Sequence, residues 1–300
     1  MQLAALGNPD VEQPFDLAVV EPMIRNEADM AYRRRVKTIF EWLQPADGDL
    51  ILDGGTGRGF YLRFIRQICA ADLVGLELEY SIIEVARHSL DCLSDIDLIN
   101  GSLYNIPFPD SSFDKVILSE VLEHIPDDVR ALREVARILK PGGLIAITVP
   151  NADYPFWWDP INKTLEALFN MHIQRGMLAG LWANHVRLYT RDQLREAVIE
   201  AGLQVAAERA FTHYSFPFIH NLVYGVGKPV LEAGVLPSGM ARAADRHNLT
   251  DDKGSPLNPV NIGLRIFEWF DRKNEMDEPE GRTTVNLCAL ARKSSSVDGQ

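Results

Sequence analysis

The chain has 300 residues, a formal net charge of −12, and 46% hydrophobic and 24% charged residues. This composition is typical of a globular protein with a substantial core. The negative charge disfavours a nucleic-acid partner, because a negative surface repels phosphates. The basic run at 33–37 has helical spacing, which predicts a solvent-exposed helix face rather than a phosphate-binding patch.

The cysteines and the N-terminus indicate the compartment. Cys69, Cys92 and Cys288 show neither the paired spacing of a disulfide framework nor that of a zinc site. The first residues lack the basic start and apolar stretch of a signal peptide, so a cytoplasmic location is predicted. The most apolar stretch, 216–236, is interrupted by prolines and charges, so we expect no transmembrane segment. The sequence does not decide whether the protein contacts a membrane peripherally.

From residue 30 to residue 150 the predicted elements alternate between helix and strand. Residues 1–28 are expected to form an irregular lead-in, and a first helix runs from near Met30 to Pro45. The elements predicted next are strands at 50–53, 73–77, 97–100, 115–119 and 144–149, and helices at 61–68, 81–93 and 127–140. This alternation predicts a parallel, doubly wound α/β sheet with right-handed crossovers.

After Pro150 the alternation is interrupted by two expected insertions, at 151–184 and 212–281, and the latter is expected to be long and irregular. Between and after them the pattern predicts a helix at 191–202 and strands at 203–206 and 283–290. We therefore interpret residues 1–300 as one domain of seven strands. Its cofactor-binding core lies at about 30–150, and the insertions select the substrate.

A glycine-rich loop follows the first predicted strand. Asp53 ends that strand, and Gly55, Gly57 and Gly59 come next, just before a helix. Glycines let the backbone approach a ligand closely, and a helix N-terminus offers free N–H groups to an anion. The spacing is Gly-x-Gly-x-Gly, not the Gly-x-Gly-x-x-Gly of a pyrophosphate site, which argues against a nicotinamide dehydrogenase.

Glu77 ends the second predicted strand, at the distance at which a mononucleotide-binding unit places an acid on ribose hydroxyls. Together with the glycine loop it indicates a ligand that contains a nucleoside. Dinucleotide enzymes share this feature, so Glu77 alone does not say which nucleoside is bound.

Further segments identify the resemblance. They are Asn-Gly-Ser-Leu-Tyr-Asn-Ile-Pro-Phe-Pro-Asp at 100–110, Leu-Ser-Glu-Val-Leu-Glu-His-Ile-Pro at 118–126 and Leu-Lys-Pro-Gly-Gly at 139–143. With the glycine loop, they resemble the class I S-adenosylmethionine-dependent methyltransferases, especially the branch with quinone-biosynthesis and natural-product enzymes. The resemblance covers about residues 30–150. It implies a Rossmann-like sheet, mostly parallel with an antiparallel last strand, in which the last two strands form the antiparallel edge.

The resemblance implies S-adenosylmethionine as the cofactor and assigns roles to matching residues. Asp53 would anchor the loop and the amino group, the three loop glycines would border the methionine and ribose portions, and Glu77 would take both ribose hydroxyls. The other implied cofactor contacts are Ser102 and Leu103 beside the adenine, and Ser119 and Glu120 near the sulfonium. Many relatives carry Asp where this chain has Ser102, and a hydroxyl accepts a hydrogen bond less strongly than a carboxylate.

Candidate catalytic residues follow the fourth strand. Glu120, Glu123 and His124 are expected to open a helix there and to converge on one pocket, where a general base would help methyl transfer. In small-RNA 2′-O-methyltransferases and some quinone O-methyltransferases, a similar Glu-x-x-Glu-His binds a divalent ion, and the former add a later His, much like His185 here. The resemblance thus implies Glu120, His124 and His185 as catalytic candidates. With Glu123 they form a candidate metal set, although relatives with no known metal carry the same pentapeptide.

The insertions supply many aromatic side chains, which line ligand pockets but also form ordinary core. They are Phe156, Trp157, Trp158, Phe169, Trp182, Phe211, Tyr214, Phe216 and Phe218, with His213 and His220 as further base candidates. We predict methyl transfer to a small lipophilic or aromatic acceptor, at oxygen rather than at carbon or nitrogen. The alternatives are an RNA-terminal 2′-O-methyltransferase with a divalent metal, and a non-catalytic cofactor-binding scaffold.

Overall fold

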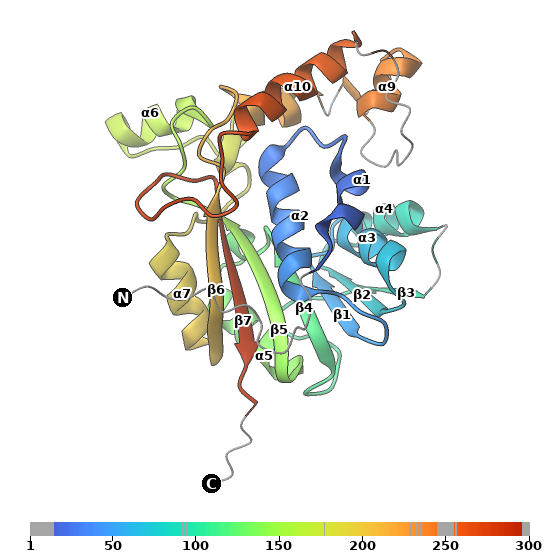
Figure 1. The fold of residues 1–300 in the computed structure, drawn as a ribbon. Helices are drawn as coiled ribbons and strands as arrows, with labels where there is room; N and C mark the ends of the chain where they lie inside the picture. Colours follow the sequence, from blue (N-terminus) through green and yellow to red (C-terminus); the bar gives the residue numbers. More distant parts are fainter. Residues whose placement is uncertain are drawn as a thin grey trace.

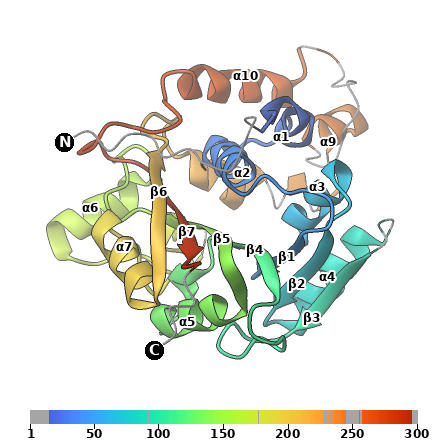
Figure 2. The same cartoon turned by 60° about the horizontal axis from the view of Figure 1, so that its bottom comes forward.

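A seven-stranded sheet with helices on both faces forms the body of the molecule in the computed structural model (Figures 1 and 2). The structure describes residues 15–295 except 92, 94, 177, 228–229, 232, 235, 245–254 and 256. The strands are β1 Leu50–Gly54, β2 Asp72–Glu77, β3 Ile96–Asn100, β4 Phe113–Ser119, β5 Leu139–Pro150, β6 Leu203–Phe211 and β7 Asn286–Lys293. Every strand predicted from the sequence is therefore present.

The strand order is β3-β2-β1-β4-β5-β7-β6. The first five strands pair in parallel, whereas β7 pairs antiparallel with both β5 and β6. The predicted antiparallel last strand is confirmed, but it lies inside the sheet and β6 forms the edge. The order reverses between β1 and β4, so a ligand is expected at the carboxyl ends of these strands.

Two layers of helices bury the sheet. The helical segments are η1 Leu17–Val19, α1 Glu21–Ile24, α2 Met30–Leu43, α3 Phe60–Ile68, α4 Tyr80–Leu90, η2 Leu122–His124, α5 Asp128–Ile138, α6 Pro160–Phe169, η3 Gly180–Trp182, α7 Arg191–Glu200, η4 Asn221–Gly227, α9 Ser238–Ala244 and α10 Pro259–Asp271. The apolar sides of α2 and α3 pack on one face of the sheet, and those of α5 and α7 pack on the other (Figure 2). Burial of these apolar stripes is the main stabilising contribution.

The segment after β4 is not the expected helix opening. Glu120 has a left-handed backbone with φ 57°, a short 3₁₀ turn (η2) follows, and α5 begins only at Asp128. Pro126 disfavours helical geometry in the residue before it, and the Asp127 carboxylate accepts a hydrogen bond from the Arg130 N–H at 3.1 Å. The helix therefore starts after the proline, and the residues from Glu120 to His124 form a short loop that ends in the 3₁₀ turn η2.

The insertion at 212–281 is not irregular, because it contains η4, α9 and α10. In Figure 1, α10 lies across the upper end of α2. Arg33 pairs with Glu268 at 3.1 Å and Arg34 pairs with Asp271 at 2.9 Å, so the predicted solvent-exposed basic face is wrong. The carboxylates that pair with these arginines lie more than two hundred residues later in the chain. The local spacing of the basic run therefore does not reveal them.

The lead-in also has more structure than expected, since η1 and α1 place Val20, Met23 and Ile24 in the core. Cys69 and Cys288 are free thiols, and Cys92 lies outside the described residues. Among the described residues, no helix is both long enough and apolar enough to cross a membrane.

Candidate functional site

The glycine loop lies at the carboxyl end of β1, beside the end of β2. The N–H groups of Gly55 and Thr56 both donate to the Leu76 carbonyl, at 2.8 and 3.0 Å. The Gly57 N–H donates to the Glu77 carboxylate at 3.1 Å. The loop and the acid therefore lie side by side at the carboxyl ends of β1 and β2, next to the switch point between β1 and β4.

The three glycines have positive φ, at 73°, 54° and 77°, but they serve different purposes. A Cβ at Gly55 would lie 2.6 Å from Val121, and one at Gly59 would lie 2.6 Å from Leu90. A Cβ at Gly57 would meet no atom within 4 Å. The outer glycines thus allow close packing, whereas Gly57 borders open space where a ligand could lie.

The Glu77 side chain is held in place by the backbone around it. Its second carboxylate oxygen accepts from the N–H groups of Leu78 and Glu79, at 2.8 and 3.2 Å. The Asn100 side-chain amide donates to the carbonyls of Glu77 and Leu78, at 2.9 and 2.8 Å. Sequence reasoning missed Asn100, which fixes the turn that presents the acid.

Asp53 lies behind the loop and is buried. It accepts a hydrogen bond from the Thr56 hydroxyl at 2.8 Å, and its burial raises its pKa to about 7. This hydrogen bond connects Asp53 to the glycine loop.

Ser102 and Leu103 follow β3. The Ser102 hydroxyl accepts a hydrogen bond from the Tyr104 N–H at 3.2 Å, and Leu103 is buried.

Hydroxyl groups connect the end of β4 to β5. Ser119 lies 3.0 Å from the Tyr61 hydroxyl and 3.0 Å from the Thr148 hydroxyl, which donates to Glu120 at 3.0 Å. Because Thr148 has one proton to give, it accepts from Ser119, and Ser119 in turn accepts from Tyr61. The three hydrogen bonds are therefore all donated in the same direction, from Tyr61 of α3 toward the Glu120 carboxylate.

Glu120 also pairs with a cation from α2. The Arg35 guanidinium lies 2.6 Å from one Glu120 oxygen, and Asn286 donates to the other at 3.2 Å. Burial raises the pKa of Glu120, and Arg35 opposes that rise. Sequence reasoning missed Arg35, Asn286 and Thr148 as site residues, and Arg35 had been assigned to a solvent-exposed face.

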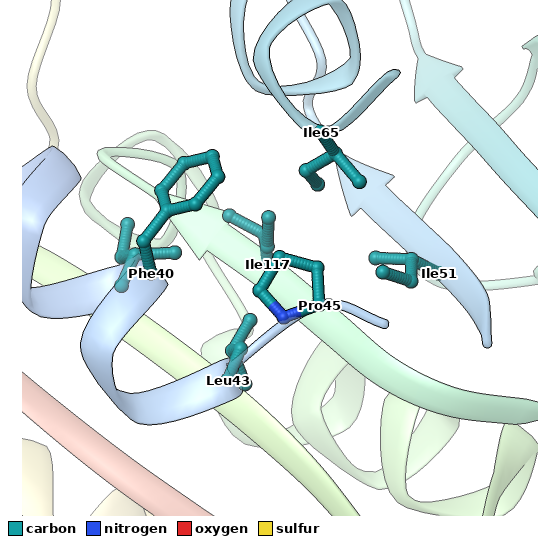
Figure 3. Close-up of a pocket in the computed structure, with 7 residues that line it drawn as sticks. Phe40, Leu43, Pro45, Ile51, Ile65 and Ile117 are labelled. Carbon is teal, nitrogen blue, oxygen red and sulfur yellow. The ribbon is translucent and has the colours of Figure 1, made fainter. Parts of the chain in front are cut away.

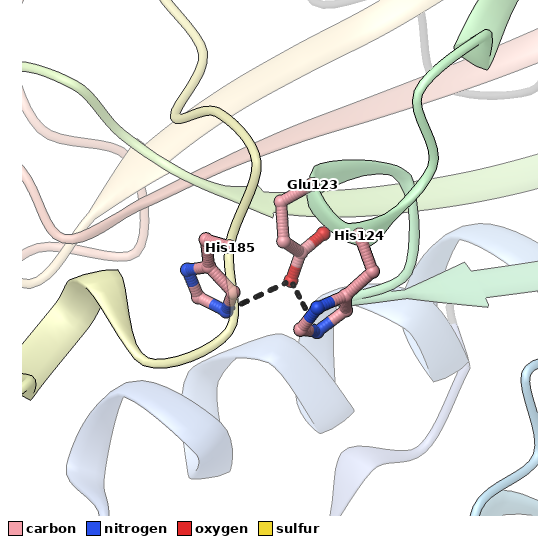
Figure 4. Close-up of side chains that lie close together, drawn as sticks. All are labelled: Glu123, His124 and His185. Atoms are coloured by element: carbon pink, nitrogen blue, oxygen red, sulfur yellow. Dashed lines mark ion pairs between the residues drawn. The ribbon is translucent and has the colours of Figure 1, made fainter. Parts of the chain in front are cut away.

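Glu123, His124 and His185 form a second cluster (Figure 4). Each offers one ligand atom, and these atoms all lie within 4.8 Å of one another. One Glu123 oxygen is 4.0 Å from Nε2 of His124 and 3.9 Å from Nε2 of His185. The structure therefore brings together three of the four candidate metal ligands, whereas the fourth, Glu120, pairs with Arg35.

The electrostatics of this cluster are unusual. The Glu123 side chain is 0% exposed, and neither carboxylate oxygen has a hydrogen-bond partner in another described residue. Burial raises the pKa of Glu123 well above its usual range and lowers the pKa of His185 to about 4. A buried carboxylate is expensive unless a proton or a cation compensates it. Two imidazoles and a carboxylate are a donor set that suits zinc or iron(II).

The remaining candidates are more dispersed. Trp158 and Phe211 are buried in the core, whereas Phe156, Trp157 and Phe169 are exposed. His213 contacts the Thr283 carbonyl at 2.8 Å, and burial lowers the pKa of His220. The other aromatic candidates are Trp182 and Phe216, which are partly buried, and Tyr214 and Phe218, which are exposed.

An apolar pocket lies elsewhere, between α2, α3, β1 and β4 (Figure 3). Its lining residues are Ile39, Phe40, Leu43, Pro45, Ile51, Ile65 and Ile117. Pro45 and Ile51 place it near the start of β1, the end opposite to the glycine loop. It offers no polar side chain to orient a ligand, so we interpret it as a packing gap in the core.

Comparisons of the sequence with known proteins show which proteins this chain resembles. Residues 52–147 match the family model described as "Methyltransferase domain". A demethylmenaquinone methyltransferase from Staphylococcus epidermidis is 38% identical over 73 residues, which are 24% of this chain and 30% of the relative. One from Listeria welshimeri is 36% identical over 93 residues, 30% of this chain and 39% of the relative. The chain thus spans well under half the length of these relatives.

Solved structures share the fold over most of the chain. A sarcosine dimethylglycine methyltransferase structure from Galdieria sulphuraria has a TM-score of 0.51 at 17% identity, covering 91% of this chain and 87% of its own. The [4+2]-cyclase SpnF has a TM-score of 0.52 at 17% identity, covering 92% and 95%. At such low identity these likenesses concern the fold alone.

Proposed function

We propose that the chain is a class I S-adenosylmethionine-dependent methyltransferase, and that it methylates a small lipophilic or aromatic acceptor, at oxygen in preference to carbon or nitrogen. The observation that carries the proposal is the hydrogen bond from the Gly57 N–H to the Glu77 carboxylate at the carboxyl ends of β1 and β2. The space beside the Gly57 Cα is open, so a ligand can lie against this pair. A demethylmenaquinone methyltransferase is named for a lipophilic quinone, which supports this class of acceptor.

The residues present fit the cofactor. S-adenosylmethionine supplies an electrophilic methyl group on a sulfonium, so the chain has to bind and align rather than to activate the donor. The Glu77 carboxylate is suited to two ribose hydroxyls, and Asn100 holds the turn that presents it. Asp53 supports the loop through Thr56, and Ser119 and Glu120 would line the end near the sulfonium. Ser102 and Leu103 would lie beside the adenine.

We assign the general base to His124. Its Nδ1 lies 3.1 Å from the Asn184 carbonyl, which fixes the proton on Nδ1 and leaves the lone pair on Nε2. The ring is partly exposed, so that a proton taken from an acceptor hydroxyl can pass to water. His185 packs against this ring with 4.7 Å between the centroids. Glu120 would help to orient the acceptor.

A divalent ion held by Glu123, His124 and His185 is a second candidate feature of the same site. The observation that favours it is the fully buried Glu123 carboxylate with two imidazole nitrogens at about 4 Å. Such an ion would lower the pKa of an acceptor hydroxyl. The RNA-terminal alternative uses this chemistry, but the net charge of −12 opposes an RNA substrate.

Cofactor binding and turnover test the proposal separately. Calorimetry with S-adenosylhomocysteine should show at least tenfold weaker binding for Glu77→Ala, about 1.4 kcal/mol, and no change for the exposed Glu84→Ala on α4. His124→Gln should keep cofactor affinity and lose most of kcat on phenolic acceptors. Unchanged affinity in a folded Glu77→Ala protein would contradict the cofactor site, and tight cofactor binding without turnover on any acceptor would favour the scaffold alternative.

The metal is tested by titrating Mg²⁺, Mn²⁺ and Zn²⁺ into the protein saturated with S-adenosylhomocysteine. Binding to the wild type that is lost in His185→Asn would support the ion. An absence of binding in all three titrations would leave His124 as an ordinary general base. Transfer of labelled methyl groups to lipophilic phenols, but not to small RNA, would separate the two acceptor classes.

A further inference from the structure

Helix α10 has two chemically different faces. One face contacts the body of the protein: Leu264 is buried, and the rings of Phe267 and Phe270 lie 5.6 and 5.7 Å from the ring of Phe216. The two carboxylates of the helix, Glu268 and Asp271, pair with Arg33 and Arg34 of α2. The acids of α10 are therefore on the inward side, where cations neutralise them.

The opposite face is exposed and combines apolar with basic side chains. Ile262, Ile266 and Trp269 are 42%, 41% and 54% exposed, at the i, i+4 and i+7 positions that form one stripe. Arg265, Arg272 and Lys273 are exposed as well. With 3.6 residues per turn, and with the helical rotation continued through Arg272 and Lys273, all six residues point outward within an arc of about 120°. None of the six is acidic, in a chain with a net charge of −12.

The exposed face combines the features of an interfacial helix. The Lys273 ammonium lies 4.1 Å from the centre of the Trp269 ring, which places a cation beside the largest apolar side chain. Trp prefers the boundary between lipid headgroups and acyl chains, and cations beside it are attracted to anionic headgroups. In Figure 1, α10 lies along the upper edge of the molecule, above α2.

We propose that this outward face of α10 docks on an anionic lipid surface. A helix of 13 residues is too short to cross a bilayer, so the contact is parallel to the membrane plane. A symmetric pairing with a second copy would bring six cations together, which opposes the stripe as a homodimer interface. The inference stands apart from the methyl-transfer proposal, because none of the six residues belongs to the cofactor or base site.

Vesicle binding tests the proposal. The full chain should co-sediment with equimolar phosphatidylcholine and phosphatidylglycerol vesicles, and bind much more weakly to phosphatidylcholine alone. Ile266→Gln with Trp269→Gln should weaken the binding at least tenfold. The control is Ile199→Gln on α7, another exposed isoleucine, which should leave the binding unchanged. Arg265→Gln with Lys273→Gln should lose about fivefold per cation, about 1 kcal/mol each, and added salt should mask this loss.

Several outcomes would overturn the proposal. They are equal binding by the α10 variants and the wild type, equal binding to the two kinds of vesicle, or no binding of the wild type at all. Light scattering without lipid adds another: a wild-type dimer that Trp269→Gln dissociates would assign the stripe to a protein interface. Circular dichroism and cofactor affinity, both expected to match the wild type, confirm that each variant is folded.

Discussion

Arg35 of α2 and Glu120 at the end of β4 form an ion pair with 2.6 Å between Nη1 and Oε2. The pair joins α2, which precedes the glycine loop in the chain, to the loop that carries the candidate catalytic residues. Because Glu120 also accepts from Thr148 and Asn286, one carboxylate links α2, β5 and β7. The position of this carboxylate therefore depends on three elements that are distant in sequence.

Removal of Arg35 should shift the pH dependence of catalysis. Arg35 lowers the pKa of Glu120, so in Arg35→Met that pKa rises further, and the acidic limb of the kcat/KM profile should move to higher pH. The variant should also lose about 3–5 kcal/mol of stability, because a partly buried carboxylate loses its partner. Denaturant unfolding and pH–rate profiles measure both. Adding Glu120→Gln should restore much of the stability, and an unmoved acidic limb would contradict the role of the pair.

The loop glycines should separate stability from binding. Gly59→Ala combines a left-handed backbone with a clash against Leu90, and should cost about 2–4 kcal/mol of stability. Gly57→Ala meets no neighbour, so it should cost about 1 kcal/mol from backbone strain. Its methyl group would nevertheless fill the ligand space and weaken S-adenosylhomocysteine binding at least tenfold. Equal cofactor affinity in Gly57→Ala and the wild type, measured by calorimetry, would exclude this space from the site.

Asp53→Asn should stabilise the protein at alkaline pH. The folded pKa of about 7 lies above the ordinary value of 3.8, so ionisation of Asp53 costs stability progressively as pH rises between these values. The variant should be about 2–3 kcal/mol more stable than the wild type near pH 8, and similar to it near pH 4. Urea unfolding across this range measures the difference. The exposed Asp72→Asn serves as the control, and a gain that does not depend on pH would contradict the assignment.

Arg34 should hold α10 against α2. Its guanidinium pairs with Asp271 and donates to the Glu275 carbonyl at 2.8 Å. Arg34→Met should cost about 3 kcal/mol and should speed hydrogen exchange in α10. In Arg87→Met, which breaks an exposed pair on α4, the loss should stay below about 1 kcal/mol. Unaltered exchange of α10 amides in Arg34→Met would show that other contacts hold the helix.

The strands and most helices were predictable because each is specified by its own residues. Apolar runs and the stop signal near Pro45 define elements locally, and each of the seven observed strands overlaps a predicted one. The bounds are less exact, because β5 begins at Leu139 and includes residues 141–143, which the sequence predicts before the strand. The helices of the insertion at 212–281 were missed, although α10 has an apolar stripe. Its apolar residues lie both on the side that faces the body and on the exposed side. The helix therefore has little contrast between a polar and an apolar side, which is the signal that sequence analysis uses.

The candidate site was predictable where one segment supplies the chemistry. The glycine loop, Glu77 and the Glu123–His124 pair all follow the ends of strands. Arg35 was missed because a run of three arginines suggests a solvent-exposed face. A signal was present, however: Arg35 lies four residues from both Ala31 and Ile39, which are buried, so it belongs to the apolar stripe of α2. A cation inside such a stripe predicts a buried acidic partner, but not that the partner is Glu120.

The position of β7 has a consequence for how the chain reaches its native state. This strand is translated after the other six, yet it must enter between β5 and β6, with Pro150 opposite Asn286 and Phe211 opposite the same residue. Until the ribosome has released this segment, the backbone edges of β5 and β6 remain unpaired. Such open edges invite pairing with other chains, so the time between synthesis of β6 and arrival of β7 is when a nascent chain is most exposed to aggregation.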